Sequence, residues 1–115
     1  MFDFEKFDVY KKAKQLTKEL SELISSLKYA HPRLIDQLQR ATLSIPLNIA
    51  EGAGRYSKAD KRHFYIIARG SVFECVAILD VLLDMDLIRK KQKAAYYERL
   101  EELSKMISGL INSQK

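Results

Sequence analysis

The sequence predicts an all-α fold, an antiparallel up-down-up-down bundle of four helices in one domain over residues 1–115. Helix-forming residues dominate the composition, whereas the chain has only four glycines and two prolines. Four segments repeat apolar residues at alternating spacings of three and four, which is the period of an amphipathic helix. The chain contains no Asn-Gly or Asp-Gly pair and no sustained period-two run, so no segment is predicted to be a strand. Short connections between such helices favour antiparallel neighbours.

The first two helices are expected over residues 7–27 and 32–51, with Pro32 in the first turn of the second. Pro46 should kink the second helix, because it removes the backbone bond to the Thr42 carbonyl. The hydroxyls of Thr42 and Ser44 are expected to help satisfy the freed carbonyls. The inward positions of these helices are Val9, Ala13, Leu16, Leu20, Leu23 and Leu27, then Leu34, Leu38, Ala41, Ile45 and Asn48.

The third helix should begin after Ser57 as N-cap and run to Asp84, and the fourth should span residues 89–112. Gly52 and Gly54 are expected to end the second helix before that cap. The inward positions of the last two helices are Phe64, Ile67, Ser71, Cys75, Ile78 and Leu82, then Tyr96, Leu100, Leu103, Ile107 and Leu110.

The second and third helices carry apolar residues on more than one face. A helix that is apolar all round is buried all round, so we expect these extra faces to lie against other subunits of a homo-oligomer. The alternative is a thicker core within one chain, filled by long side chains of the first and last helices. The expected interface residues are Leu43, Leu47, Val72, Phe73, Val76, Leu79 and Leu83.

Polar residues interrupt the apolar faces of these two helices. Buried charges persist only when they are paired, so we interpret Arg40, Asn48, Glu51 and Glu74 as a buried or interfacial polar network that fixes helix register. Glu74 should lie near Asp36 if the two helices are antiparallel neighbours. Gly70 and Ser71 should let a neighbouring helix approach closely.

Two basic clusters are the candidate nucleic-acid-binding residues, in a chain of net charge +5. Cations hold phosphates, and an aromatic side chain among them can stack on an unpaired base. The second cluster opposes the dipole at a helix N-terminus, although a solvated loop explains it as well. The first cluster contains Arg55, Lys58, Lys61, Arg62, Tyr65 and Arg69, and the second contains Arg89, Lys90, Lys91 and Lys93.

Catalysis, metal binding and cofactor binding are not expected. Cys75, His31 and His63 are too few for a four-ligand zinc site, and no nucleophile has an adjacent base. One cysteine fits a reducing compartment, and residues 1–10 do not form a signal peptide, so we expect a cytoplasmic protein. No apolar run is long enough to span a membrane.

Three blocks resemble the four-helix-bundle family named for 23S rRNA intervening-sequence proteins. They are QLQRATLSIPLNIAEG at residues 37–52 followed by GRYS at 54–57, IARGSVFE at 67–74, and GLI at 109–111. Two departures are a short connection at residues 29–33 and the absence of the usual glycine at 84–86. Both departures change end surfaces where a partner would dock.

The resemblance implies a bacterial protein that forms ring-like homopentamers. It also implies a setting in rRNA intervening sequences or in a diversity-generating retroelement, whose related accessory proteins bind nucleic acid and reverse transcriptase. The expected function is therefore non-catalytic binding of RNA or DNA phosphates with low sequence specificity. The alternative is a protein-interaction scaffold that docks an acidic partner such as a reverse transcriptase.

Overall fold

The computed structural model describes all 115 residues and is all-α, with four long helices and no strands. The helices are α1 (Asp8–Leu27), α2 (Pro32–Ala53), α3 (Lys58–Asp84) and α4 (Lys90–Ser113). Each predicted helix is present with bounds that agree to within one helical turn. A short 3₁₀ helix, η1 (Asp3–Lys6), precedes α1 and was not expected.

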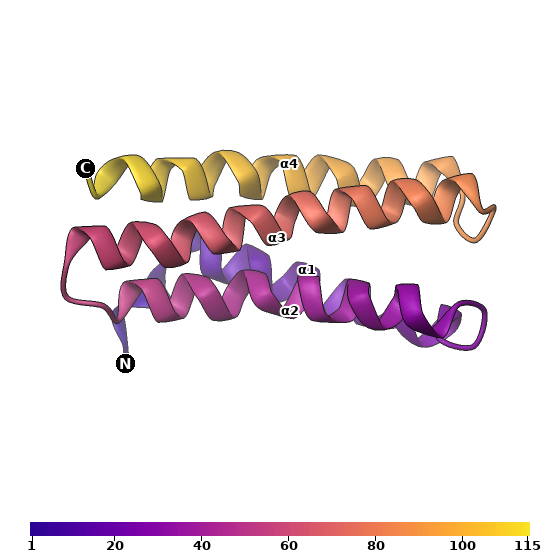
Figure 1. The fold of residues 1–115 in the computed structure, drawn as a ribbon, viewed down its shortest axis with the longest axis horizontal. Coiled ribbons are helices and arrows are strands. Elements are labelled where there is room, and N and C mark those ends of the chain that lie inside the picture. Colours follow the sequence, from indigo (N-terminus) through magenta and orange to yellow (C-terminus); the bar gives the residue numbers. More distant parts are fainter.

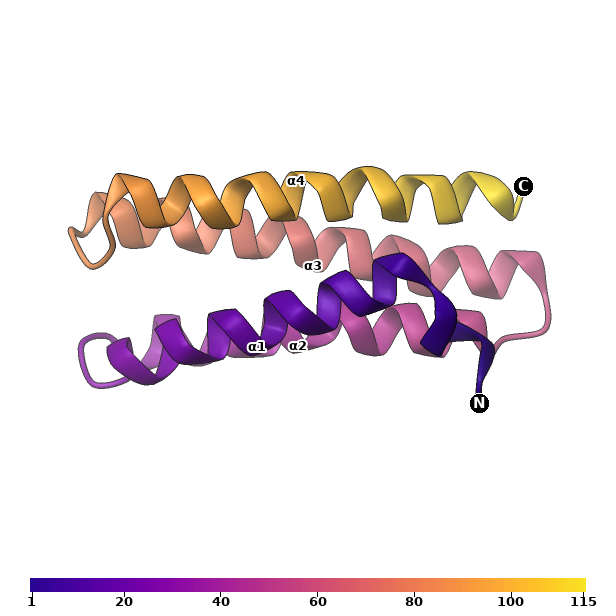
Figure 2. The ribbon, with the colours of Figure 1, turned by 180° about the vertical axis from the view of Figure 1, so that it is seen from behind.

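The four helices form a rod of 44 × 22 × 21 Å (Figures 1 and 2). The α1–α2 and α3–α4 loops lie at one end of the rod. Both chain termini and the α2–α3 loop lie at the other end (Figure 1). The closest packing joins α2 to α3 and α3 to α4. This arrangement places α3 between two neighbours, and it brings the C-terminus beside the beginning of α3.

The core is a single cluster of 22 buried apolar residues. Most of the predicted inward positions belong to it, as the helical period requires. The prediction is wrong at the beginning of α3, where Ile67 is exposed and Phe64 is only half-buried. Tyr65 and Ala68 take the inward positions there, because the contact face has rotated by one residue. No helix is both long and apolar enough to cross a membrane.

The extra apolar face of α3 is largely an intramolecular contact, which corrects the interface expectation. Val72 and Leu79 are 1% exposed, and Val76 and Leu83 pack against the core. The physical reason is that α3 contacts α2 on one side and α4 on the other. The remaining interface candidates are exposed in the single chain; they are Leu43, Leu47 and Phe73.

Gly52 lies inside α2 and does not end it. The helix continues to Ala53, with Gly54 as its C-cap. A Cβ atom on Gly52 would lie 2.7 Å from Cε1 of Tyr65, well inside van der Waals contact. The absence of a side chain at Gly52 therefore allows the buried Tyr65 ring to lie against the α2 backbone.

The α3–α4 connection is a Schellman-type turn at the end of α3. The Leu87 amide donates to the Leu82 carbonyl and the Asp86 amide donates to the Leu83 carbonyl, both at 3.0 Å. Asp86 has a φ of 59°, the only positive φ among the non-glycine residues. An aspartate thus occupies the left-handed position that usually favours glycine.

Pro46 is accommodated within a continuous α2 helix. The Thr42 carbonyl that it leaves without a backbone donor lies 3.5 Å from the Thr17 hydroxyl of α1. The Thr42 hydroxyl bonds instead to the Leu38 carbonyl at 2.7 Å. The expectation that Thr42 and Ser44 would serve this carbonyl is therefore wrong, because a neighbouring helix approaches it.

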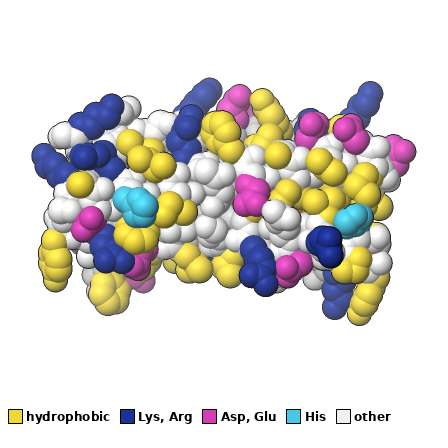
Figure 3. Space-filling view, in the orientation of Figure 1, with side chains coloured by type: hydrophobic (Ala, Val, Ile, Leu, Met, Phe, Trp, Pro, Cys, Tyr) yellow, Lys and Arg dark blue, Asp and Glu magenta, His cyan; other side chains and the backbone are white.

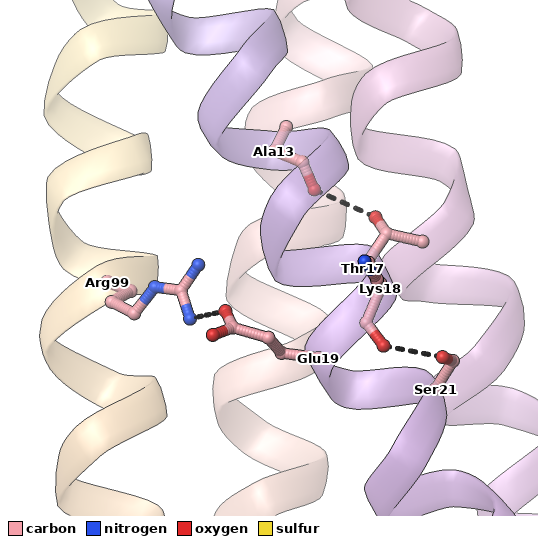
Figure 4. A network of polar contacts seen from close by, with 6 residues as sticks. All are labelled: Ala13, Thr17, Lys18, Glu19, Ser21 and Arg99. Carbon is pink, nitrogen blue, oxygen red and sulfur yellow. Dashed lines mark hydrogen bonds and ion pairs between the residues drawn. The ribbon is translucent and has the colours of Figure 1, made fainter.

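Ion pairs join α1 to α4 across the least closely packed side of the bundle. Arg99 pairs with Glu19, as the dashed line in Figure 4 marks, and Lys12 pairs with Glu102. A hollow of about 290 Å³ lies between these pairs and the core residues Leu16 and Leu103. Exposed pairs of this kind each contribute only about 0–1 kcal/mol, so they align α1 and α4 more than they stabilise them.

Candidate nucleic-acid interface

The two basic clusters lie at opposite ends of the rod. The first surrounds the α2–α3 loop and the beginning of α3, and the second lies at the beginning of α4. Figure 3 shows Lys and Arg side chains gathered where α4 ends and α3 begins, whereas Asp and Glu side chains are prominent at the upper right end. A single small ligand cannot contact both clusters.

The α2–α3 loop is short and held at both sides by hydrogen bonds. The Gly54 amide reaches the carbonyls of Ala50 and Glu51 at 3.2 Å. The Ser57 hydroxyl accepts from the Asp60 amide at 3.0 Å, which confirms Ser57 as the N-cap. Lys61 Nζ donates to the Ala53 carbonyl at 2.8 Å and so closes the end of α2.

The cations of the first cluster are held in different ways. Arg55 pairs with Glu51, and its guanidinium lies 4.5 Å from the centre of the Phe64 ring. Arg62 donates to the Gln114 carbonyl, which holds the C-terminal end of α4 against α3. Lys58 is exposed and makes no hydrogen bond or ion pair. The loop end therefore carries both bonded and unpaired positive charge.

Tyr65 is not available to a ligand, which corrects its assignment as a stacking residue. Its side chain is 2% exposed, and burial raises the pKa of its phenol. The aromatic residue that sequence reasoning missed is Tyr56, which is 103% exposed in the loop between Arg55 and Ser57. Position was the available signal, because Tyr56 stands in a short connection and outside the apolar period of both neighbouring helices.

Arg69 lies apart from the rest of the first cluster, about three helical turns beyond Lys58. Its guanidinium lies 4.7 Å from the centre of the Phe73 ring. Its Nε atom is buried without a hydrogen-bond partner. The structure therefore joins Arg69 to the exposed α3 surface around Phe73 and not to the loop.

The second cluster is partly neutralised by carboxylates. Lys93 Nζ donates to Asp80 at 2.8 Å, and this hydrogen bond raises the pKa of Lys93. Asp84 and Asp86 line one shallow hollow together with Arg89 and Lys90. Lys91 is exposed. Three carboxylates thus accompany the four cations of the second cluster, whereas two, Glu51 and Asp60, accompany the loop cations Arg55, Lys58, Lys61 and Arg62.

The expected polar network consists of short surface contacts. Arg40 pairs with Asp36 one turn away and keeps 80% of its side chain exposed, so its charge is not buried within the chain. Asn48 bonds to Ser44 and Glu51 to Arg55, each within α2 or at its end.

Two side-chain hydrogen bonds join α2 to α3 around Ser44 and Glu74. Gln37 donates to Glu74 at 3.1 Å, and Ser71 donates to Ser44 at 2.8 Å. Asp36 and Glu74 line the same groove, so the expected proximity of these carboxylates is confirmed. Nothing lies within 4 Å of a Cβ atom placed on Gly70, so no helix of the same chain approaches closely there.

The nucleophilic and metal-binding side chains are dispersed or buried. Burial raises the pKa of the Cys75 thiol to about 11, and its sulfur lies 3.5 Å from the Thr42 hydroxyl. His31 Nδ1 accepts from the Leu34 amide at 3.2 Å and caps α2. No three His, Cys, Asp or Glu side chains gather into a metal site.

Comparison with known proteins identifies one family and a similar fold. The model of the 23S rRNA-intervening sequence protein family matches residues 5–109. A crystal structure of a protein of unknown function from the S23 ribosomal protein family of Bacteroides thetaiotaomicron is similar at a TM-score of 0.85. It shares 23% identity, and the match covers 90% of this chain and 95% of that chain. A comparison with curated proteins finds no match.

Proposed function

Because the chain belongs to the 23S rRNA-intervening sequence protein family, we propose that it binds RNA or DNA phosphates with low sequence specificity. In this proposal the chain is an up-down-up-down bundle that assembles into a homo-oligomer, with a pentamer as the expected form. Its setting is an rRNA intervening sequence or a retroelement.

The observation that carries the proposal is the basic surface at the α2–α3 loop. It is made by Arg55, Lys58, Lys61 and Arg62. Cations on a short, hydrogen-bonded loop attract a phosphate backbone without reading base edges, which accounts for low sequence specificity. Lys58 is the most available of them, because the other three already donate to the protein.

Exposed apolar side chains on α2 and α3 support self-association. Leu43, Leu47 and Phe73 are 48%, 57% and 54% exposed. Their burial between subunits would remove this apolar surface from water. An oligomer would also repeat the basic surface, so that one long nucleic acid binds several copies at once.

We propose that the protein acts by binding and not by catalysis, inside the cytoplasm. The only thiol, Cys75, is buried and stays protonated at neutral pH, so it is a poor nucleophile. A free thiol also fits a reducing compartment.

Salt dependence tests the phosphate contacts directly. Binding of a fluorescent RNA is measured by anisotropy at several salt concentrations, and particle mass is measured by light scattering. The affinity should fall steeply as salt rises, because each phosphate contact releases a counterion. Absence of binding to bare RNA and DNA at low salt would overturn the proposal and direct attention to an acidic protein partner.

Two matched double variants locate the binding surface. Arg55→Gln with Lys58→Gln removes two positive charges beside the α2–α3 loop. The slope of log K against log salt concentration should become shallower by about one for each phosphate that the variant no longer neutralises. Lys90→Gln with Lys91→Gln removes two charges at the other end and should leave affinity within about twofold of wild type. An equal weakening by both variants would mean that net charge, and not the loop surface, causes binding.

A further inference from the structure

We propose that Tyr56 is a stacking platform for an unpaired base, so that the α2–α3 loop prefers single-stranded RNA or DNA to duplex. This inference rests on the proposed function, since it specifies the form of nucleic acid that the basic loop holds. The motivating observation is a fully exposed aromatic ring in a short loop, with Arg55 immediately before it and Lys58 two residues after it.

The exposure of Tyr56 has no explanation in the fold of the chain. Its side chain is 103% exposed, the highest value among the large apolar and aromatic residues. It makes no side-chain hydrogen bond, aromatic contact or cation–π contact. A tyrosine ring gains free energy when it is buried against another surface. Tyr56 therefore offers an entire ring face to a ligand.

Hydrogen bonds hold the chain on both sides of Tyr56. The Arg55 amide donates to the Gly52 carbonyl at 3.2 Å, immediately before Tyr56. Ser57 caps α3 immediately after it. With both neighbours fixed, the backbone of Tyr56 loses little further freedom when a base stacks on the ring, so the loop is pre-organised.

Cations on both sides of Tyr56 can hold the phosphates that flank a stacked base. Arg55 is fixed by Glu51 and by the Phe64 ring. Lys58 is exposed and unpaired in the first turn of α3, where backbone amides also favour an anion. Lys61 Nζ donates to the carbonyl of Ala53, the last residue of α2 before the loop. Stacking on an aromatic ring between phosphate contacts is the usual mode of single-strand binding.

Binding by stacking favours single-stranded nucleic acid, whereas binding by charge alone favours duplex. A duplex carries about one phosphate per 1.7 Å of its axis, a higher charge density than either strand alone. A surface that attracts only charge therefore binds duplex at least as well as single strand. Bases within a duplex are already stacked and paired, so Tyr56 cannot reach their faces. If the protein binds the single strand more tightly than the duplex, the difference in affinity therefore reports the contribution of the Tyr56 ring.

The experiment compares one RNA of about twelve nucleotides, single-stranded and as a blunt duplex, in the same low-salt buffer. Anisotropy gives Kd for wild type and for Tyr56→Ala. Wild type should bind the single strand more tightly. Tyr56→Ala should weaken single-strand binding by about 5- to 100-fold and leave duplex binding unchanged.

Tyr29 provides the matched control. It is 86% exposed in the α1–α2 loop at the opposite end of the rod, with Lys28 Nζ 5.0 Å from its ring centre. Tyr29→Ala should bind both RNAs like wild type. Both side chains are exposed, so neither variant should alter helical content or thermal unfolding.

A second readout reports on the ring itself. The chain has no tryptophan, so Tyr56→Trp and Tyr29→Trp each introduce a single indole. Single-stranded RNA should quench the emission of Tyr56→Trp and leave that of Tyr29→Trp unchanged.

Three results would overturn the inference. They are wild-type affinity of Tyr56→Ala for the single strand, an equal weakening of its binding to single strand and duplex, and absence of quenching in Tyr56→Trp at saturating RNA. In each case, persistent salt-sensitive binding would leave the proposed function standing. Absence of binding to either RNA would instead overturn the proposed function and the inference together.

Discussion

Gly52 controls how closely α2 and α3 pack at the loop end. A methyl group there would meet Tyr65 Cε1 at 2.7 Å and Cδ1 at 2.9 Å. Both atoms belong to a buried ring that has little room to move. Glycine is therefore required at position 52 because Tyr65 packs against it, and not because α2 ends there.

We predict that Gly52→Ala lowers the free energy of unfolding by about 1–3 kcal/mol, because overpacking outweighs the gain in helix propensity. Urea denaturation followed by circular dichroism measures the change. Gly109→Ala is the control, since nothing lies within 4 Å of a Cβ there, and it should stabilise α4 by up to about 1 kcal/mol. A stabilised Gly52→Ala variant would show that the Tyr65 ring moves freely.

Cys75 illustrates what burial does to a titratable group. Desolvation raises the pKa of its thiol from 9.0 to about 11, because the thiolate is disfavoured away from water. The folded state therefore holds the proton more tightly than the unfolded chain does. The resulting contribution to stability is present below about pH 9 and is lost as the pH rises toward 11.

We predict that a thiol-alkylating reagent modifies native Cys75 at about pH 8 many times more slowly than the urea-unfolded chain, because the folded thiol is both buried and protonated. Mass spectrometry of timed samples gives the two rates. The free energy of unfolding should also decline as the pH rises from 9 to 11. Equal rates of modification would mean that the core opens readily around Cys75.

At the scale of the element, the end of α3 depends on one unusual backbone conformation. Asp86 occupies the left-handed position of the Schellman turn, which carries the chain from α3 toward α4. Glycine adopts this conformation without steric cost, whereas other residues do so less readily. The absence of the usual glycine is therefore compensated by an aspartate that tolerates this backbone geometry.

We predict that Asp86→Gly raises the free energy of unfolding by up to about 1 kcal/mol, because it removes the steric cost of the positive φ. Thermal unfolding checks the sign. Asp84→Gly is the matched control, because Asp84 is the last residue of α3, where glycine should destabilise by up to about 1 kcal/mol. A destabilised Asp86→Gly variant would indicate that the Asp86 side chain itself stabilises the turn.

At the scale of the whole molecule, the position of each helix decides which apolar faces remain available. α3 lies between α2 and α4, and most of its second apolar face is buried within the chain. The outer side of α2 leaves Leu43 and Leu47 exposed one turn apart. Self-association should therefore depend on this pair more than on Leu79.

We predict that Leu47→Glu, and Leu43→Glu separately, lower the particle mass in light scattering while the helical signal persists, because a charge would be buried between subunits. Val81→Glu is the control, since Val81 is 44% exposed on α3 outside the proposed contact, and its mass should match wild type. Leu79→Glu should unfold the chain, because Leu79 is 1% exposed. Wild-type mass in both α2 variants would contradict the proposed interface.

The sequence by itself determined the helices and most of the core. Apolar spacing, the Ser57 cap and Pro32 are local signals, and a helix depends on contacts within a few residues along the chain. The same period identified Leu16, Leu38 and Leu100 as inward positions, and all three are fully buried.

Only the tertiary structure decided which residues of the candidate site reach solvent. Tyr65 and Tyr56 both stand among cations in the sequence, yet one lies against Gly52 in the core and the other projects from the loop. The same holds for Val72 and Leu47: both lie outside the predicted inward positions, yet Val72 is buried and Leu47 is exposed. The physical reason is that exposure depends on which helix packs on which face, a property of pairs of elements far apart in the chain that no local pattern contains.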